Sequence, residues 1–239
     1  MLVLAVDTAT PAVTAGLVEL EQGVDAGTPV RMRTVASRVR VDPRAHAEVL
    51  TPQILECLTE AGRSRTDIAA LVVGVGPGPF TGLRVGMATA AAFGDALGIP
   101  VYGVCSLDAI AADAALDPAL RPAAAELRPA GELLVVTDAR RREVYWARYR
   151  DGARTAGPEV CKPTDLDAGQ ATAIAGSASH VDFFDLPVLP AETPSPAGLV
   201  RVAAVDVCAR AVPDPLVPLY LRRPDAVENA YRTLDRTRA

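Results

Sequence analysis

A loop rich in glycine and proline, Gly74–Gly86 (GVGPGPFTGLRVG), constrains the fold of this chain more than any other feature. It joins an apolar strand pattern over residues 69–75 to a helix pattern over residues 81–97. Glycine permits backbone angles that other residues avoid, so the chain must turn sharply here or allow another segment to come close. The loop therefore predicts a strand–turn–helix unit at the centre of an α/β domain.

The composition of the loop argues against a phosphate cradle. Pro77 and Pro79 each lack the backbone N–H that such a cradle uses as a donor. The spacing G-x-G-x-x-G also fails, because a proline or a threonine stands at the third glycine in either frame. A Walker loop needs a lysine, and the only lysine of the chain is the distant Lys162. The loop is thus expected to be architectural rather than catalytic.

The helix after the loop repeats small residues every four positions, at Gly82, Gly86 and Ala90. Residues four apart share one face of a helix, and small ones let another backbone approach closely. Two interpretations stay open: an ordinary core helix, or a surface on which another helix docks.

The composition limits the classes of function. With 239 residues the chain can form one large domain or two lobes. The net charge of −5 and the pI near 5.1 do not suit a protein that grips nucleic acid alone. The singly scattered cysteines indicate reduced thiols, and Asp7 interrupts the apolar N-terminus too early for a signal sequence. No apolar segment is long enough to span a membrane, so we expect a cytoplasmic protein.

The opening of the chain is repeated in its second half. An apolar strand over residues 2–7 ends in Asp7, and a second strand follows over residues 13–18. Residues 133–138 and 144–149 repeat this order, with Asp138 at the matching place. A third strand over residues 30–41, helices over 45–61, from Ser106 and over 199–211, and strands over 101–104 and 173–175 complete the expected elements.

This repeat and the basic C-terminal residues predict that the chain has three parts. We expect an N-terminal lobe over residues 1–112, a shorter C-terminal lobe over 113–221, and a basic tail over 222–239 that is solvated and poorly ordered.

Several segments together resemble the TsaB (YeaZ) family, in the order in which that family carries them. They are the strand ending in Asp7-Thr8, the loop Gly76–Gly86, Tyr102–Leu107 (YGVCSL), Asp138–Tyr145 (DARRREVY) and Pro218–Arg222 (PLYLR). The resemblance covers nearly the whole chain. It implies an α/β, two-lobed fold of the kind shared by actin, Hsp70 and sugar kinases, with duplicated ribonuclease-H-like lobes and a reduced second lobe.

The resemblance also implies a function. It predicts a non-catalytic subunit of the complex that forms N6-threonylcarbamoyladenosine at position 37 of tRNAs that read ANN codons. The implied partners are a TsaD-like catalytic subunit, a TsaE-like ATPase and, through the complex, tRNA. Alone, the chain is expected to form a homodimer. No cofactor is expected on this chain, ATP or ADP at the subunit interface is left open, and the metal is assigned to the partner.

The residues of the two aspartate turns agree with a non-catalytic role. Enzymes of this fold hold phosphates on glycine-bearing turns, yet neither Asp7 nor Asp138 is followed by glycine. We interpret Asp7, Thr8, Arg140 and Arg141 as vestigial contacts to a nucleotide or anion, with structural caps and a solvated turn as the alternatives. His46 has no histidine four residues later, so no metal site is expected.

Two enzymatic alternatives remain in view. A hydrolase would need a nucleophile such as Ser106 or Thr81 near His46 and Asp7, but no spacing supports a triad and Ser106 is expected to cap a helix. A small-molecule kinase is suggested by the fold alone.

A third interpretation is that the chain is a non-catalytic subunit that docks on a partner protein. The helices over residues 45–61 and 81–97 are predicted to pack against an equivalent pair on the partner, in a four-helix contact. The interface residues expected on these helices are His46, Val49, Leu50, Ile54, Leu83, Gly86, Met87 and Ala90. A bulky charged residue at Gly86 or Ala88 should then abolish pairing and leave the monomer folded.

Overall fold

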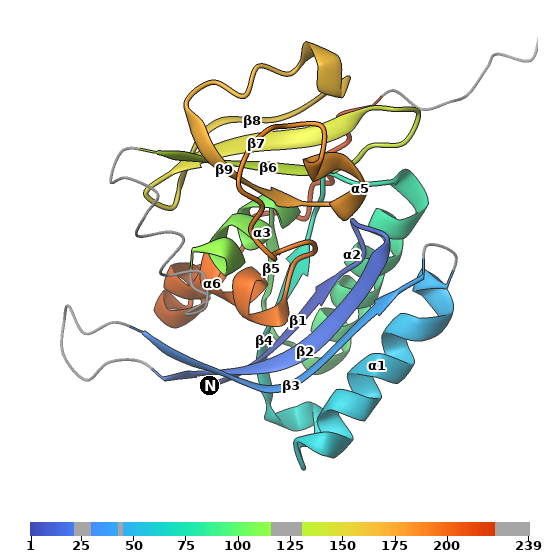
Figure 1. Cartoon of the computed structure of the whole chain (residues 1–239). Helices are drawn as coiled ribbons and strands as arrows, with labels where there is room; N and C mark the ends of the chain where they lie inside the picture. The colour runs from blue at the N-terminus through green and yellow to red at the C-terminus, as the bar shows by residue number, and fades with distance from the viewer. Residues whose placement is uncertain (22–29, 43–44, 116–130, 223–239) are drawn as a thin grey trace, which may run out of the picture.

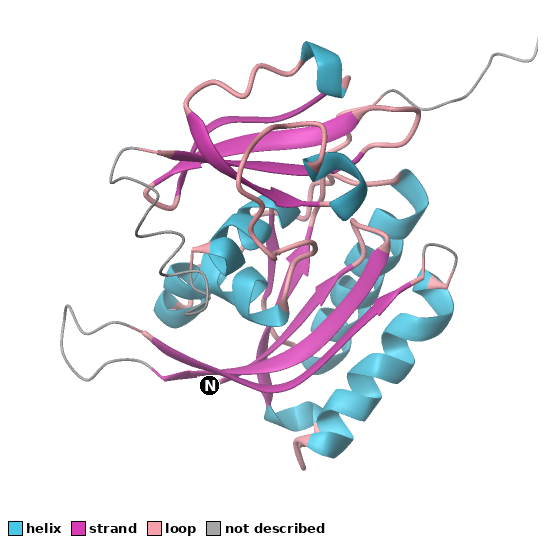
Figure 2. Cartoon of the chain, viewed as in Figure 1, coloured by secondary structure: helices cyan, strands magenta, loops and turns pink. Residues whose placement is uncertain are grey.

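Two β-sheets, with helices beside and between them, make up the protein (Figures 1 and 2). The computed structural model describes residues 1–21, 30–42, 45–115 and 131–222. The first sheet has the strand order β3-β2-β1-β4-β5 and the second the order β8-β7-β6-β9. The strands are β1 Leu2–Asp7, β2 Ala12–Glu21, β3 Arg31–Val41, β4 Ile68–Gly74, β5 Val101–Val104, β6 Glu132–Asp138, β7 Val144–Arg150, β8 Ala153–Cys161 and β9 Ala171–Gly176. The helices are α1 His46–Glu60, α2 Phe80–Leu97, α3 Ser106–Ala114, α5 Ala178–Val181 and α6 Pro196–Ala209, with 3-10 turns η1 Arg65–Asp67 and η2 Pro163–Asp165.

The two sheets share one topology, which confirms the repeat seen in the sequence. β1 pairs antiparallel with β2 and parallel with β4, and β6 pairs antiparallel with β7 and parallel with β9. Both parallel pairs even carry a register shift near their start, between Leu2 and Val3 in one and between Glu132 and Leu133 in the other. The second lobe is smaller, as expected: it has four strands, and its α5 has four residues where α2 has eighteen.

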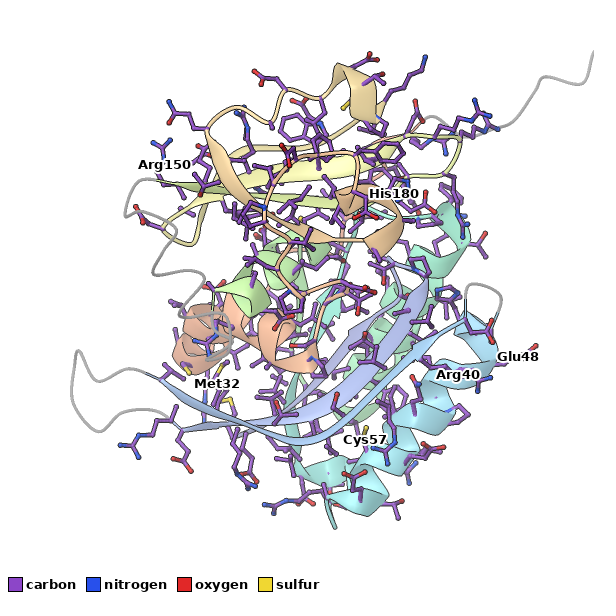
Figure 3. All side chains as sticks on the ribbon, in the orientation of Figure 1. Met32, Arg40, Glu48, Cys57, Arg150 and His180 are labelled. Carbon is purple, nitrogen blue, oxygen red and sulfur yellow. The ribbon has the colours of Figure 1, made fainter. Side chains whose placement is uncertain are left out.

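Helices cover both faces of the first sheet. α1 and α2 lie on one face, where Leu50, Ile54 and Leu83 pack against Leu4 and Leu17. Cys57 points from α1 toward this sheet (Figure 3), and its Sγ lies 3.7 Å from the carbonyl oxygen of Ala15. The apolar stripes of α1 and α2 are therefore used within the lobe.

α6 covers the opposite face of the first sheet, although it comes from the C-terminal part of the chain. Leu199, Val200 and Ala203 pack against Val3 and Ala5. The prediction that residues 113–221 form one C-terminal lobe is corrected here, because α6 returns to the N-terminal sheet. The sequence pattern did not reveal the return, since an apolar helix fits either sheet equally well. Residues 116–130 and 223–239 lie outside the described residues, and the second range includes nearly all of the expected tail.

α3 lies between the two sheets and joins the lobes (Figure 1). Its Leu107 and Ile110 share a buried cluster with Val135 and Tyr145 of the second sheet. The side chains of Tyr149 and Asp108 add a polar contact, since the Tyr149 hydroxyl donates to Asp108 Oδ1 over 2.7 Å.

Most of the expected helices and strands begin and end within three residues of their predicted bounds, with a few exceptions. Ser106 is not the N-cap of α3; Cys105 takes that position, and the Ser106 hydroxyl bonds to Asp7 instead. β8 and α5 were not predicted.

Candidate functional site

The aspartate turn of the first lobe is closed by the protein itself. Asp7 stands at the end of β1 and is fully buried. Its Oδ2 accepts a hydrogen bond from the Ser106 hydroxyl over 2.5 Å, and its Oδ1 accepts one from the Ala9 N–H over 2.9 Å. Burial raises the pKa of this carboxyl to about 6, although these hydrogen bonds oppose the rise. Both carboxylate oxygens thus have partners from the chain, and none of the side chain is exposed to an outside ligand.

Thr8 fastens the same turn to α2. Its hydroxyl donates to the Gly82 carbonyl over 2.7 Å and accepts from the Gly86 N–H over 2.9 Å. These are the two groups that an ordinary helical bond would pair. A Cβ on Gly86 would overlap Thr8 Oγ1, and one on Gly82 would lie 2.8 Å from the Thr8 carbonyl oxygen. Gly82 and Gly86 of α2 therefore leave room for the turn that follows β1.

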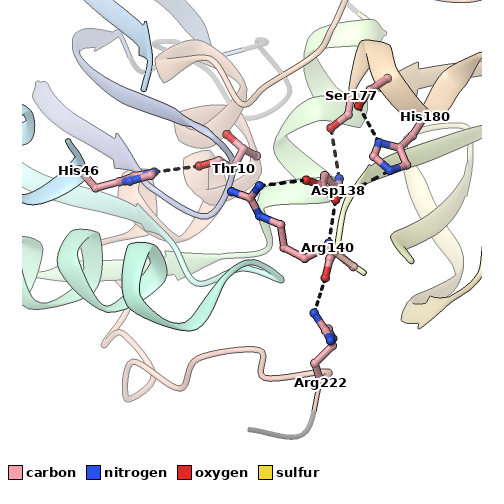
Figure 4. Close-up of polar contacts among 9 residues, drawn as sticks. Thr10, His46, Asp138, Arg140, Ser177, His180 and Arg222 are labelled. Atoms are coloured by element: carbon pink, nitrogen blue, oxygen red, sulfur yellow. Dashed lines mark hydrogen bonds and ion pairs between the residues drawn. The ribbon is translucent and has the colours of Figure 1, made fainter. Parts of the chain in front are cut away.

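His46 belongs to this internal arrangement as well. Its Nε2 lies 3.0 Å from the carbonyl oxygen of Thr10, which is itself buried (Figure 4). The imidazole therefore lies against the Thr10 backbone at the start of α1.

The residues predicted for a partner interface are mostly core residues. His46 and Val49 are half-buried, and the remaining six are buried: Leu50, Ile54, Leu83, Gly86, Met87 and Ala90. As direct contacts to a partner these six are corrected, because their side chains already pack in the first lobe. The helix pattern alone could not tell a face turned to the sheet from a face turned outward.

The outward faces of the same helices carry different residues. On α2, Arg84, Ala88 and Ala92 are exposed and follow one another at intervals of four. At the start of this row, Phe80 and Tyr220 stack with ring centroids 4.5 Å apart, although both are over a third exposed. The Arg84 guanidinium lies 3.6 Å from the centroid of the Phe80 ring, and its Nε donates to the Tyr220 hydroxyl over 2.8 Å. We call Phe80, Arg84, Ala88, Ala92 and Tyr220 the α2 outer face.

The aspartate turn of the second lobe is open. Asp138 keeps about a fifth of its side chain exposed, and its Oδ1 accepts from the Arg140 N–H over 2.7 Å. The Arg140 guanidinium lies 3.7 Å from Oδ2, and His180 Nε2 lies 3.8 Å from Oδ1 (Figure 4). The Asp138 N–H donates to the Ser177 hydroxyl over 3.2 Å. This carboxylate is therefore surrounded by cationic and polar groups near the surface.

A basic pocket lies beside this second turn. It has a volume of about 620 Å³, and its lining residues are Arg141, Arg142, Lys162, Pro163, Thr164, Ser179, His180 and Phe183. Arg140 and Arg141 were predicted as candidate contacts from the sequence, whereas Lys162 and His180 were not, because these two residues come from segments without a local motif. The structure brings Arg141 together with them, whereas Asp7 and Thr8 belong to the closed turn of the other lobe.

The arrangement of Ser106 and Asp7 does not match the triad of the hydrolase alternative. A hydrolase triad places an imidazole between the hydroxyl and the carboxylate, whereas Ser106 bonds directly to Asp7 and is itself fully buried. Within the part of the chain that the structure describes, no three His, Cys, Asp or Glu residues gather as ligands for a metal ion. In the same residues, no helix has both the length and the hydrophobicity of a membrane span.

Comparison with known proteins identifies the family. The family described as TsaD, tRNA N6-adenosine threonylcarbamoyltransferase, matches residues 39–211. The structure of YeaZ from Pseudomonas aeruginosa superposes with a TM-score of 0.69 and 25% identity, over 92% of this chain and 99% of that one. A second structure from the same organism, described as similar to the peptidase YeaZ, gives 0.70 and 29% over the same shares. The chain belongs to the TsaB/YeaZ-like family.

Relatives by sequence fall into two groups. An uncharacterized protein of Mycobacterium tuberculosis is 56% identical over 94% of this chain and 93% of its own length. The tRNA threonylcarbamoyladenosine biosynthesis protein TsaB of Escherichia coli is 35% identical over 63% of this chain and 55% of its own length. The superposed structures and the topology of the two sheets confirm the expected α/β fold of the actin, Hsp70 and sugar-kinase type with two ribonuclease-H-like sheets.

Proposed function

We propose that this chain is a non-catalytic subunit of the machinery that forms N6-threonylcarbamoyladenosine at position 37 of ANN-decoding tRNAs in the cytoplasm. In this role it pairs with a TsaD-type transferase, a TsaE-type ATPase joins the assembly, and tRNA is reached through the complex. The observation that carries the proposal is the closed turn of the first lobe. Asp7, the carboxylate that a catalytic member of this fold would present to its substrate, has no exposed surface and two internal hydrogen-bond donors.

The α2 outer face supports the pairing part of the proposal. Aromatic and arginine side chains are the residues that most often dominate protein–protein binding energy. Here Phe80, Arg84 and Tyr220 form one stacked group next to the exposed Ala88 and Ala92. Small residues at intervals of four allow a second helix to approach closely. The partner helices therefore pack along this row, and in the absence of the partner a second copy of the chain occupies it.

The pairing is tested by replacing Ala88, whose side chain points outward. Ala88→Arg should abolish co-elution of the purified chain with the TsaD-type subunit, while circular dichroism and the melting temperature stay unchanged. Ala209→Arg is the matched control, because Ala209 is an exposed alanine at the end of α6. Co-elution that survives Ala88→Arg at the wild-type affinity would locate the interface elsewhere. A replacement of Gly86 is unsuitable here, since it would disturb the contact with Thr8.

The role in the modification is tested in cells depleted of this chain. Nucleoside analysis of total tRNA should show loss of threonylcarbamoyladenosine on depletion and its return with the wild-type gene. Persistence of the modification after depletion would refute the assignment. Turnover of ATP or of a peptide by the purified chain alone would instead favour the kinase or hydrolase alternative.

A further inference from the structure

The basic pocket beside the second-lobe turn is built from three separate segments. Arg141 and Arg142 come from the turn between β6 and β7, Lys162 from the connection between β8 and η2, and His180 and Phe183 from α5 and the residues after it. Figure 3 shows the His180 side chain on α5, in the second lobe. A volume of about 620 Å³ lies within the range of pockets that hold small organic ligands.

The charge of the lining is of one sign. Arg141, Arg142 and Lys162 contribute three cations and His180 a fourth basic group, and the described residues that line the pocket include no aspartate or glutamate. In the described part of the chain, neither Arg142 nor Lys162 forms an ion pair. The whole chain carries a net charge of −5 and only one lysine, so its composition does not predict such a concentration of basic groups in one pocket. Such a cluster is most stable when an anion occupies it.

The turn that carries the two arginines is held in an unusual conformation. Arg140, Arg141 and Arg142 have φ values of 64°, 53° and 64°, a left-handed run that costs non-glycine residues about 1–2 kcal/mol each. The run is closed by the bond from the Ala139 N–H to the Glu143 carbonyl over 3.0 Å. The arginines thus project from a fixed backbone rather than from a free loop, which lowers the entropy that a ligand must overcome.

The pocket also offers a surface for a planar group. The Phe183 ring is 64% exposed, and its centroid lies 6.0 Å from that of the His180 imidazole. The Ser179 hydroxyl lies 2.8 Å from His180 Nδ1, which fixes the orientation of that imidazole. An exposed aromatic ring beside basic groups is the combination on which nucleic-acid bases stack.

We propose that this pocket binds a nucleoside phosphate, with the phosphate on Arg142 and Lys162 and the base against Phe183. The guanidinium group suits the oxygens of a phosphate by its paired N–H donors, and the ammonium adds a point charge. The same chemistry is offered by a free nucleotide and by a nucleotide of an RNA chain. The site is independent of the α2 outer face and does not require the proposed pairing.

The test measures binding of ATP, of pyrophosphate and of a short single-stranded RNA to the full chain by calorimetry at low salt. Lys162→Glu and Arg142→Glu should each weaken ATP binding tenfold or more. Phe183→Ala should weaken ATP several-fold and leave pyrophosphate unchanged. Arg65→Glu is the matched control, because Arg65 is an exposed arginine of η1 in the other lobe, and should leave binding unchanged.

Each outcome decides the proposal. Binding of ATP that depends on Lys162 and Phe183 supports a free nucleotide as the ligand. Binding of RNA but not of ATP, with the same dependence, supports a nucleotide of an RNA chain. If the wild-type chain binds none of the three probes at millimolar concentration, the proposal is wrong. It is also wrong if Lys162→Glu and Arg142→Glu both leave the binding affinity unchanged. Neither result bears on whether Ala88 lies in the pairing surface.

Discussion

The two aspartate turns occupy the same place in the two lobes, yet one is closed and the other is open. Asp7 ends β1 and Asp138 ends β6, each between an antiparallel and a parallel neighbour. After the parallel strand of the first lobe comes α2, with eighteen residues, and after that of the second lobe comes α5, with four. The long helix receives Thr8 and helps to enclose the first turn, whereas the short one leaves the second beside a basic pocket. The accessibility of an aspartate turn thus depends on the helix that follows the neighbouring strand.

The difference extends to electrostatics. Burial raises the pKa of Asp7, although the hydrogen bonds to its carboxylate oppose the rise. Asp138 instead lies within 4 Å of the basic groups of Arg140 and His180. Asp7 is therefore an internal structural group, whereas Asp138 lies partly exposed among basic side chains.

The largest effect is expected when the contact between α2 and the first turn is removed. Gly86→Val places a side chain where the Thr8 hydroxyl lies, so it should destabilise the fold by more than about 3 kcal/mol. Ala88→Val, on the exposed side of the same helix, should change the stability by less than about 0.5 kcal/mol. Urea unfolding of the two variants measures the comparison. Equal stabilities would mean that α2 does not close the turn.

A smaller effect is expected at the hydroxyl itself. Thr8→Val removes the donor to Gly82 and the acceptor for Gly86, and should cost about 2 kcal/mol. Thr8→Ser keeps the hydroxyl and should recover most of this loss. In the second lobe, Ser177→Ala removes one longer bond and should cost under about 1 kcal/mol. Thermal unfolding of the three variants checks the order, and a loss in Thr8→Ser as large as in Thr8→Val would contradict it.

Replacement of Asp7 is expected to increase the stability of the protein, unlike the replacements of Gly86 and Thr8. The pKa of its carboxyl is 3.8 in the unfolded chain and about 6 in the folded one. Between these values the folded state holds a proton that the unfolded state has released, so Asp7 lowers stability as the pH rises from about 4 to about 6. Asp7→Asn removes this penalty. Its amide oxygen can still accept from the Ala9 N–H and its NH2 group can donate to the Ser106 hydroxyl oxygen, so the variant should stabilise the protein by about 1–2 kcal/mol at pH 7.5.

The control for Asp7→Asn is a second stability measurement at low pH. Near pH 4 the wild-type carboxyl is protonated in the folded state, so the advantage of the variant should vanish there. Asp138→Asn keeps the acceptor for the Arg140 N–H and should change stability by less than about 0.5 kcal/mol at either pH. Melting temperatures of wild type and both variants at the two pH values give the answer. An advantage of Asp7→Asn that does not depend on pH would show that desolvation of the carboxyl is not its cause.

Local patterns in the sequence predicted every strand except β8, the long helices and the repeat of the aspartate turns. They could predict these because alternation and helical spacing report on one element at a time. They misplaced Ser106, Gly86 and α6, whose roles depend on which distant segment lies against them. Ser106 lies ninety-nine residues from Asp7 along the chain, and no pattern in the neighbourhood of either residue records their hydrogen bond. The basic pocket escaped prediction for the same reason, since Lys162 and His180 meet only in the folded lobe.

The most direct test of the account is to complement depleted cells with Asp7→Asn and to measure threonylcarbamoyladenosine in their tRNA. If the first turn only supports the fold, the variant should restore the modification to the wild-type level, and Ala88→Arg should fail to restore it although it folds. If Asp7→Asn folds and pairs normally but leaves the tRNA unmodified, the buried carboxylate takes part in the reaction and the account is wrong.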